Sequence, residues 1–252
     1  MDRGSYIAAS GGLAQQRHLD IVSNNLANVS TVGFKAERVI TRQQEFTDTL
    51  ASAMDNAPKR AELDQKATPG VIDVQTVTDF SPGPVAYTGD PLNVALSGDD
   101  TFFVVQTPDG EAYTRAGNFT KNVEGELVTP DGYPIMGEGG PISLPGGQAN
   151  IVSDGSIIAN GEAVGRIRVV KFDDTSVLRR TGGVRFISND GTKPVAVPAM
   201  LVPASVEMPN VNAVQSMVDL INANKGFEAY SKTMTSIDEL NDKAIQLART
   251  QS

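Results

Sequence analysis

The sequence contains no cysteine and no tryptophan, and its 252 residues include a single histidine, His18. Without cysteine there is no disulfide framework and no metal site with thiolate ligands. A Ser-His-Asp arrangement could be built only around His18, which lies among polar neighbours in a predicted helix and is better explained as a solvated side chain. The sequence therefore predicts no catalytic residue, no metal site and no cofactor.

Long apolar runs and an excess of basic residues are missing as well. No stretch approaches the roughly 18 apolar residues of a membrane-spanning helix, and the first residues lack the apolar core and cleavage site of a secretion signal. We therefore expect no membrane span and no cleaved signal peptide. The net charge of −9 argues against a nucleic-acid partner, because neutralising phosphates requires clustered lysine and arginine.

The charge is distributed unevenly along the chain. Residues 1–50 carry five basic and five acidic side chains, and residues 212–252 carry four and five. A charge of −8 therefore remains for residues 51–211. Both ends of the chain are thus free to pack against copies of themselves without strong like-charge repulsion.

Residues 1–35 are predicted to form a helix that ends in a turn. Apolar side chains recur every seven positions at Ile7, Ala14 and Ile21, as on one face of an amphipathic helix. The polar run 28–33 contains asparagine and glycine, which supply the backbone geometry that ends a helix. Residues 36–75 are polar and interrupted by proline, so we expect an extended linker with some helix.

Residues 76–205 change to short β-branched and aromatic runs separated by glycine, proline, asparagine and aspartate. Residues 102–106 are one such run, and Pro108-Asp109-Gly110 is a turn signal directly after it. This region is predicted to be an antiparallel β domain. The expected fold class is therefore α+β, in which long N- and C-terminal helices form a coiled-coil domain and a central antiparallel all-β domain lies between them in sequence.

Residues 206–252 are predicted to contain the second long helix. Asn212 is suited to the N-cap, with Gln215 as its partner in a capping box. From Phe227 to Leu247 apolar side chains step by three and four residues, close to a heptad seam. A helix of about 35 to 40 residues would span about 55 Å, which a partner helix of about 25 residues could not cover. An exposed apolar strip of this length invites aggregation unless neighbouring chains cover it.

Two explanations of the apolar stripes remain open. Such a stripe is more often the core between two helices of one chain, whereas the mismatch in length and the placement at opposite ends favour packing between chains. Gly226 indicates either a close helix approach or simple tolerance within a long helix. The residues predicted to form a subunit interface are Ile7, Ala14, Ile21, Leu26, Met217, Ile221, Phe227, Tyr230, Met234, Ile237, Leu240 and Leu247.

Three sets of sequence runs resemble the flagellar rod and hook protein family. The first is residues 23–35, Ser-Asn-Asn-Leu-Ala-Asn-Val-Ser-Thr-Val-Gly-Phe-Lys. The second lies in the predicted β domain, at residues 92–98, 102–105, 113–119 and 128–134, and the third begins with residues 206–212, Val-Glu-Met-Pro-Asn-Val-Asn. The motif residues of the first run are Asn24, Asn25, Leu26, Ala27, Asn28, Gly33 and Phe34.

The resemblance implies a structural subunit of the bacterial flagellar basal body. Its terminal helices would pack with copies of itself and with other rod proteins into a tube around an export channel, with the β domain outside. It also implies passage through the flagellar export apparatus without a cleaved signal, and assembly in the periplasm. Asn24, Asn25 and Asn28 would satisfy backbone groups where the helix ends, either as an ordinary cap or in a subunit contact, and Gly33 would let the chain reverse before Phe34 anchors it.

Within the family, the opening Met-Asp-Arg and residues 137–142 and 164–171 are most similar to proximal rod members, and distal rod members are the alternative. A secreted carbohydrate-active enzyme with paired carboxylates in the β domain is a hypothesis of a different class. The poor inventory of catalytic groups argues against it. Two acids facing each other in a cleft, or measured glycan cleavage, would distinguish the two.

Overall fold

A computed structural model describes residues 3–43, 72–189 and 191–250. The chain divides into two compact units. The helical unit comprises Met1–Leu26, Glu37–Val77 and Ala213–Ser252, and the β unit comprises Ala27–Ala36 and Thr78–Asn212. Most of the signature run that follows the first helix therefore belongs to the β unit, whereas the sequence-based boundaries group it with the helix.

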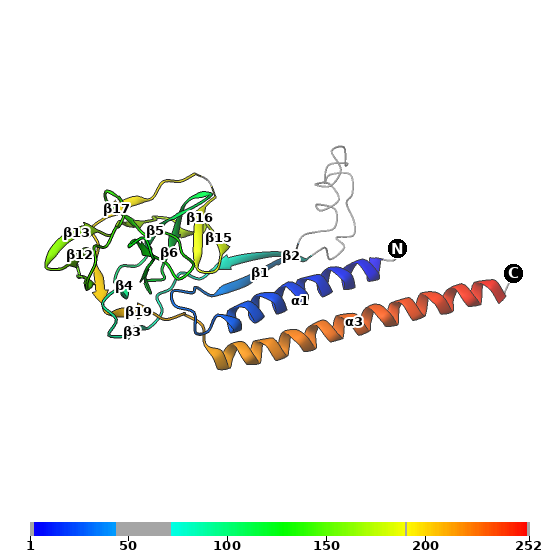
Figure 1. Ribbon diagram of the computed structural model, residues 1–252. Helices are drawn as coiled ribbons and strands as arrows, with labels where there is room; N and C mark the ends of the chain where they lie inside the picture. Colours follow the sequence, from blue (N-terminus) through cyan, green and yellow to red (C-terminus); the bar gives the residue numbers. More distant parts are fainter. Residues whose placement is uncertain (1–2, 44–71, 190, 251–252) are drawn as a thin grey trace. The chain divides into compact units, whose positions relative to one another are not determined.

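Two helices lie side by side in the helical unit (Figure 1). Helix α1 spans Arg3–Ala27 and helix α3 spans Ala213–Thr250, so α3 begins directly after Asn212, where the capping pattern predicts it. Strands β1 (Glu37–Gln43) and β2 (Ile72–Thr78) pair with each other. The predicted linker thus opens with a strand, and its residues 44–71 lie outside the described part of the chain. Neither of these two helices is long and apolar enough to cross a membrane.

The β unit is built around a six-stranded antiparallel sheet with the strand order β15-β16-β6-β5-β14-β17. Strands β5 and β6 form a hairpin across the predicted turn at Pro108-Asp109. The other pairings join distant segments, so that Val170 lies opposite Phe102 and Phe186 opposite Tyr113. The six strands are β5 (Thr101–Thr107), β6 (Gly110–Thr114), β14 (Val169–Lys171), β15 (Leu178–Gly182), β16 (Arg185–Ser188) and β17 (Val195–Val197).

Smaller sheets complete the β unit. Strands β11 (Ala149–Ile151), β12 (Ser156–Ala159) and β13 (Glu162–Arg166) form a three-stranded sheet. The two-stranded pairs are β3 (Val85–Tyr87) with β19 (Ser205–Glu207), β4 (Val94–Leu96) with β18 (Leu201–Pro203), β7 (Thr120–Lys121) with β8 (Leu127–Val128), and β9 (Met136–Gly137) with β10 (Gly140–Pro141). The 3-10 helix η2 (Thr175–Val177) precedes β15.

Strand β5 is buried on both faces, which explains its continuous apolar run. Successive side chains of a strand point to opposite faces. Phe103 and Val105 accordingly belong to one core cluster, whereas Phe102 and Val104 belong to a second. In the second cluster the ring of Phe102 packs edge-on against Phe172, with 5.8 Å between the ring centroids. The α+β class with an all-β centre, predicted from the sequence, is confirmed.

Candidate functional site

The end of the signature run, residues 33–35, is buried in the β unit. The N–H of Gly33 donates to the carbonyl of Glu207 at 2.8 Å, and the Gly33 backbone adopts φ +69°. A Cβ at this position would lie 2.3 Å from the backbone nitrogen of Ala116, so both the conformation and the space require glycine. The next side chain, Phe34, is 1% exposed, and the guanidinium of Arg180 stacks 4.5 Å from its ring centroid. Gly33 thus has the left-handed backbone conformation typical of a turn, and the side chain of Phe34 is buried directly after it.

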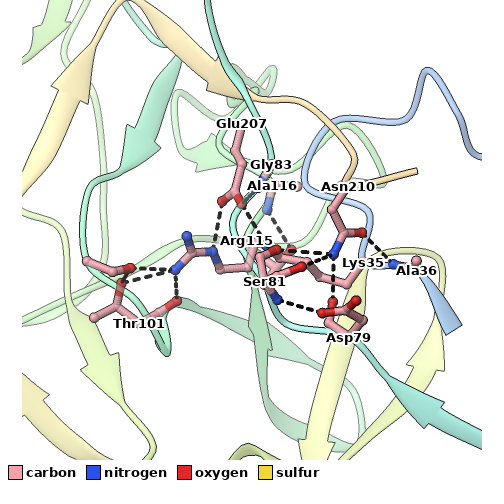
Figure 2. Close-up of polar contacts among 12 residues, drawn as sticks. Lys35, Ala36, Asp79, Ser81, Gly83, Thr101, Arg115, Ala116, Glu207 and Asn210 are labelled. Carbon is pink, nitrogen blue, oxygen red and sulfur yellow. Dashed lines mark hydrogen bonds and ion pairs between the residues drawn. The ribbon is translucent and has the colours of Figure 1, made fainter. Parts of the chain in front are cut away.

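Three charged side chains form a buried cluster directly beside this anchor (Figure 2), named here the ion triad: Lys35, Arg115 and Glu207. The ammonium of Lys35 lies 2.7 Å from Glu207 Oε1, and Arg115 Nε lies 2.8 Å from Glu207 Oε2. Each of the three residues is at most 2% exposed. The triad joins the signature run to strand β19 and to the segment after β6, which are far apart in sequence.

Further hydrogen bonds tie the ion triad to the backbone around it. Lys35 Nζ also donates to the carbonyl of Ser81 at 2.7 Å, and Arg115 Nη1 donates to the carbonyls of Gly98 and Thr101, each at 2.8 Å. The N–H of Gly83 donates to Glu207 Oε1 at 2.9 Å. Such satisfaction is what allows charges to be buried, because an unpaired buried charge is strongly destabilising.

Two cations share one carboxylate, and the pKa values respond accordingly. Burial lowers the pKa of the Lys35 ammonium; the charge and hydrogen bond of Glu207 oppose this, and the nearby charge of Arg115 adds to it. Burial alone would raise the pKa of the Glu207 carboxyl. The charges of Arg115 and Lys35, with the hydrogen bonds from Lys35 and Gly83, outweigh burial and hold that pKa below its usual value.

The motif asparagines lie on both sides of the end of α1. In the helical unit, Asn25 Oδ1 accepts from the N–H of Glu37 at 2.9 Å and Asn25 Nδ2 donates to the Glu37 carbonyl at 2.7 Å. In the β unit, the carbonyl of Asn28 accepts from the N–H of Thr31 at 3.0 Å, which forms the turn after the helix. Asn25 thus binds the backbone twelve residues later rather than serving only as a local cap.

Small residues bring α1 and α3 together in the helical unit. Gln15 Nε2 of α1 donates to the carbonyl of Ala223 in α3 at 3.1 Å. A Cβ on Gly226 would lie 2.6 Å from this same Gln15 nitrogen, and a Cβ on Gly11 would lie 2.4 Å from the ring of Tyr230. Gly226 is therefore a site of close helix approach, one of the two explanations that the sequence left open.

The predicted interface residues divide by exposure. Ala14 is buried, and Ile21, Leu26, Tyr230 and Ile237 are half-buried. The side chains of Ile7 and Leu247 lie outside the described part of the chain. Met217, Ile221, Phe227, Met234 and Leu240 are exposed, as are Val214 and Val218 on the same helix.

The ion triad and Asn210 were not predicted as functional residues. Lys35 is the last residue of the first signature run, Arg115 lies within 113–119, and Glu207 and Asn210 lie within 206–212. All four therefore belong to the runs that carry the family resemblance. Their position in those runs was the available signal, but the runs alone do not say which of their residues meet in space.

A groove of about 1000 Å³ in the β unit bears on the enzyme hypothesis, because Asp109 and Glu111 both line it. Both carboxylate oxygens of Glu111 are engaged by Arg168, at 2.8 and 3.1 Å. Among the described residues, no three histidine, aspartate or glutamate side chains gather in a way that could hold a metal ion. The groove thus offers no pair of free carboxylates from Asp109 and Glu111.

Three family models match separate parts of the chain. "Flagella basal body rod protein" matches residues 6–35, "Flagellar hook protein FlgE/F/G D1 domain" matches residues 95–162, and "Flagellar basal body rod FlgEFG protein C-terminal" matches residues 202–247. Each matched segment contributes one member of the ion triad.

Full-length relatives agree with these matches. Flagellar basal-body rod protein FlgF of Caulobacter vibrioides is 32% identical over 250 residues, covering 98% of each chain. FlgF of Salmonella typhimurium is 34% identical over 263 residues, also covering 98% of each chain. FlgG of Bacillus subtilis is 34% identical over 269 residues, covering 99% of this chain and all of that protein. The chain therefore belongs to the family of flagellar basal-body rod proteins and is FlgF-like.

Proposed function

We propose that this rod protein is a structural subunit of the proximal rod and that it polymerises through α1 and α3. The structural role in the rod follows from the family. The mode of assembly rests on one observation, the apolar side chains that α3 leaves exposed.

The exposed side chains of α3 include a stripe on the face away from α1, named here the outer stripe: Val214, Met217, Val218 and Ile221. Their exposed fractions run from 47% to 72%. They follow one another at helical spacing, and by helical periodicity they lie opposite Ala223, the residue that α1 covers. The outer stripe is therefore free for a neighbouring subunit, while the inner face of α3 serves the contact within the chain.

The free energy of burying apolar side chains favours covering the outer stripe. Fully burying one side chain of this size contributes about 1.5–3 kcal/mol, so half-covered residues of the outer stripe would add on the order of 1 kcal/mol each in every copy. Repetition along a polymer multiplies the gain, whereas a single subunit would leave the stripe in water. The 38 residues of α3 also extend further than the 25 of α1. We propose that these helices pack with those of other subunits as a coiled coil.

A matched pair of substitutions tests the outer stripe. Ile221→Glu places a charge on it, whereas Asn222→Glu places the same charge on the adjacent exposed position of α3, off the stripe. Circular dichroism should show that both proteins are folded. In cells whose own FlgF-type subunit is deleted, Asn222→Glu should restore rods and swimming and Ile221→Glu should not. Rods of normal number with Ile221→Glu would refute assembly through this face.

The proximal position is supported by the opening Met-Asp-Arg and by residues 137–142 and 164–171. Relatives named FlgF and FlgG reach similar identities, so identity alone does not separate the two positions. Expression of this chain should restore swimming to cells that lack FlgF and not to cells that lack FlgG. Rescue of the second strain alone would assign the distal rod instead.

We further propose that the chain leaves the cytoplasm through the flagellar export apparatus without a cleaved signal, works in the periplasmic part of the basal body and catalyses no reaction. Its partners would be copies of itself and other rod proteins. The support is the membership of the rod family.

A further inference from the structure

The backbone passes between the two units four times, after residues 26, 36, 77 and 212. Three of these crossings, called exits here whichever way the chain runs, lie within two residues of Ala36, Asp79 and Asn210. These three residues come from distant parts of the sequence, and each borders an element of the helical unit: β1 follows Ala36, β2 precedes Asp79, and α3 follows Asn210. Whatever holds them together fixes where those elements join the β unit.

A single carboxamide joins all three exits (Figure 2). Asn210 Oδ1 accepts from the N–H of Ala36 at 2.7 Å. Asn210 Nδ2 donates to the carbonyl of Asp79 at 2.8 Å and to the carbonyl and hydroxyl of Ser81 at 3.1 and 3.0 Å. The N–H of Asp79 closes the ring by donating to the carbonyl of Ala36 at 2.8 Å. This arrangement needs an acceptor and a donor on one short planar group, a requirement that asparagine meets and that aspartate, serine and leucine do not.

Asn210 differs from the nearby ion triad in its burial and in the groups that it binds. The triad is at most 2% exposed, so its loss disturbs the interior of the β unit. Asn210 is half-buried at the rim, and its partners are backbone groups of the exits themselves. Losing it should loosen the exits while the sheets, which it does not touch, stay folded.

We infer that Asn210 is a positioning residue for assembly: it holds three exits of the β unit together so that β1, β2 and α3, which border these exits, are anchored at fixed points. This inference rests on the proposed role of the helical unit in polymerisation. The structural part of the inference, that Asn210 joins Ala36 to Asp79 and Ser81, does not depend on that role and can be measured on the isolated protein.

The matched control is Asn122, which uses the same chemistry elsewhere in the β unit. Asn122 Oδ1 accepts from the N–H of Glu126 at 2.7 Å and Asn122 Nδ2 donates to Glu126 Oε2 at 3.2 Å. Like Asn210 it is half-buried, but it bridges only four residues within the β7–β8 hairpin. Asn210→Ala and Asn122→Ala thus delete the same kind of group, which joins distant segments in the first case and near neighbours in the second.

Residue-resolved amide hydrogen exchange of the purified full chain tests the joining. Asn210→Ala should accelerate exchange of the Ala36 and Asp79 amides at least about 10-fold, since each depends on the closed ring, and should leave the amides of β5 unchanged. Asn122→Ala should leave Ala36 and Asp79 at the wild-type rate. Unchanged exchange at Ala36 in Asn210→Ala would overturn the inference.

The consequence for assembly is tested in cells that lack their own FlgF-type subunit and express a variant, by counting rods and measuring swimming. Asn210→Ala should reduce the number of rods strongly and Asn122→Ala should not, while urea denaturation of both purified proteins checks that each β unit stays folded. Equal loss in the two variants would reduce Asn210 to an ordinary stabilising residue and overturn the positioning role. If the wild-type chain itself fails to rescue, the proposed rod function fails, while the exchange result still decides whether Asn210 joins the exits.

Discussion

Lys35 and Glu207 are 172 residues apart in the sequence, yet the ammonium of one lies 2.7 Å from the carboxylate of the other at a position 1% exposed. Arg115 occupies the second carboxylate oxygen at 2.8 Å. The cluster thus contains two cations and one anion. Because Glu207 is the only anion of the three, the members of the ion triad should not be equivalent in their contribution to stability.

Glu207→Ala should cost about 3–5 kcal/mol in the free energy of unfolding, because it leaves Lys35 and Arg115 buried without their shared counter-ion. Lys35→Met should cost less than about 2 kcal/mol, since Glu207 keeps Arg115 and the N–H of Gly83 and methionine fills most of the space. Urea denaturation followed by circular dichroism measures both. Equal losses would show that the number of ion pairs, and not the surplus of cations, governs the stability of the site.

Gly33→Ala should destabilise the β unit by more than about 2 kcal/mol, because a Cβ would lie 2.3 Å from the backbone of Ala116 at φ +69°. Gly132 is a matched control: its φ is +86°, but a Cβ there would meet nothing within 4 Å. Gly132→Ala should therefore cost only about 1 kcal/mol, the conformational part alone. A thermal melt of each variant separates the two contributions, and similar melting temperatures would show that the signature run is not packed against residue 116.

The stability of the β unit should rise with pH at both ends of the pH scale. Glu207 has a lowered pKa when folded, so between that pKa and 4.5 the unfolded chain binds more protons, and stability is lost as the pH falls through this window. Lys35 also has a lowered pKa when folded, so between that pKa and 10.5 the unfolded chain again binds more protons, and stability increases with pH there.

Denaturant unfolding across pH in Glu207→Gln and Lys35→Met checks these slopes. Glu207→Gln should flatten the acidic arm and Lys35→Met the alkaline arm. If both variants keep the wild-type slopes, groups outside the ion triad cause the pH dependence.

Adjacent glycines of α1 should respond differently to the same substitution. A Cβ on Gly12 would lie 3.8 Å from Tyr230, an ordinary contact, so Gly12→Ala should stabilise the helix by up to about 1 kcal/mol. A Cβ on Gly11 would lie 2.4 Å from the Tyr230 ring, so Gly11→Ala would have to displace that ring. The cost of this displacement should cancel the gain in helix propensity, and Gly11→Ala should not stabilise the helix. Tyrosine fluorescence and amide exchange in α1 report the difference; stabilisation by both variants would mean that α1 and α3 do not approach this closely in solution.

Elements with strong local patterns were predictable from the sequence. The heptad-like spacing and Asn212 locate α3 to within a residue, and the run from Phe102 to Val105 locates the central strand. Strand β1 lies in the predicted linker because the residues Glu37–Gln43 are mostly polar and depend on β2 for pairing, which a local pattern does not reveal. A coiled coil of the terminal helices stays a prediction.

The candidate site was less predictable for a related reason. Phe34 and Gly33 stand out by residue type, but Lys35 and Glu207 look like ordinary surface charges until the fold brings them together. Pairings such as β16 with β6 and β14 with β17 create the interior in which these charges are buried, and they join segments that no short window contains. A buried ion triad is a property of tertiary structure and leaves no periodicity in the sequence.

The hydrogen bond from Asp79 to Ala36 closes a long loop of the backbone. The chain leaves the β unit after residue 36 through β1 and returns through β2 to a point held against its own departure. Closing such a loop costs entropy that grows only with the logarithm of the number of residues in it, so a loop of twice the length should cost only about 0.6 kcal/mol more. The stability of this closure is therefore governed by the groups that meet at residues 36 and 79, far more than by the length of chain that separates them.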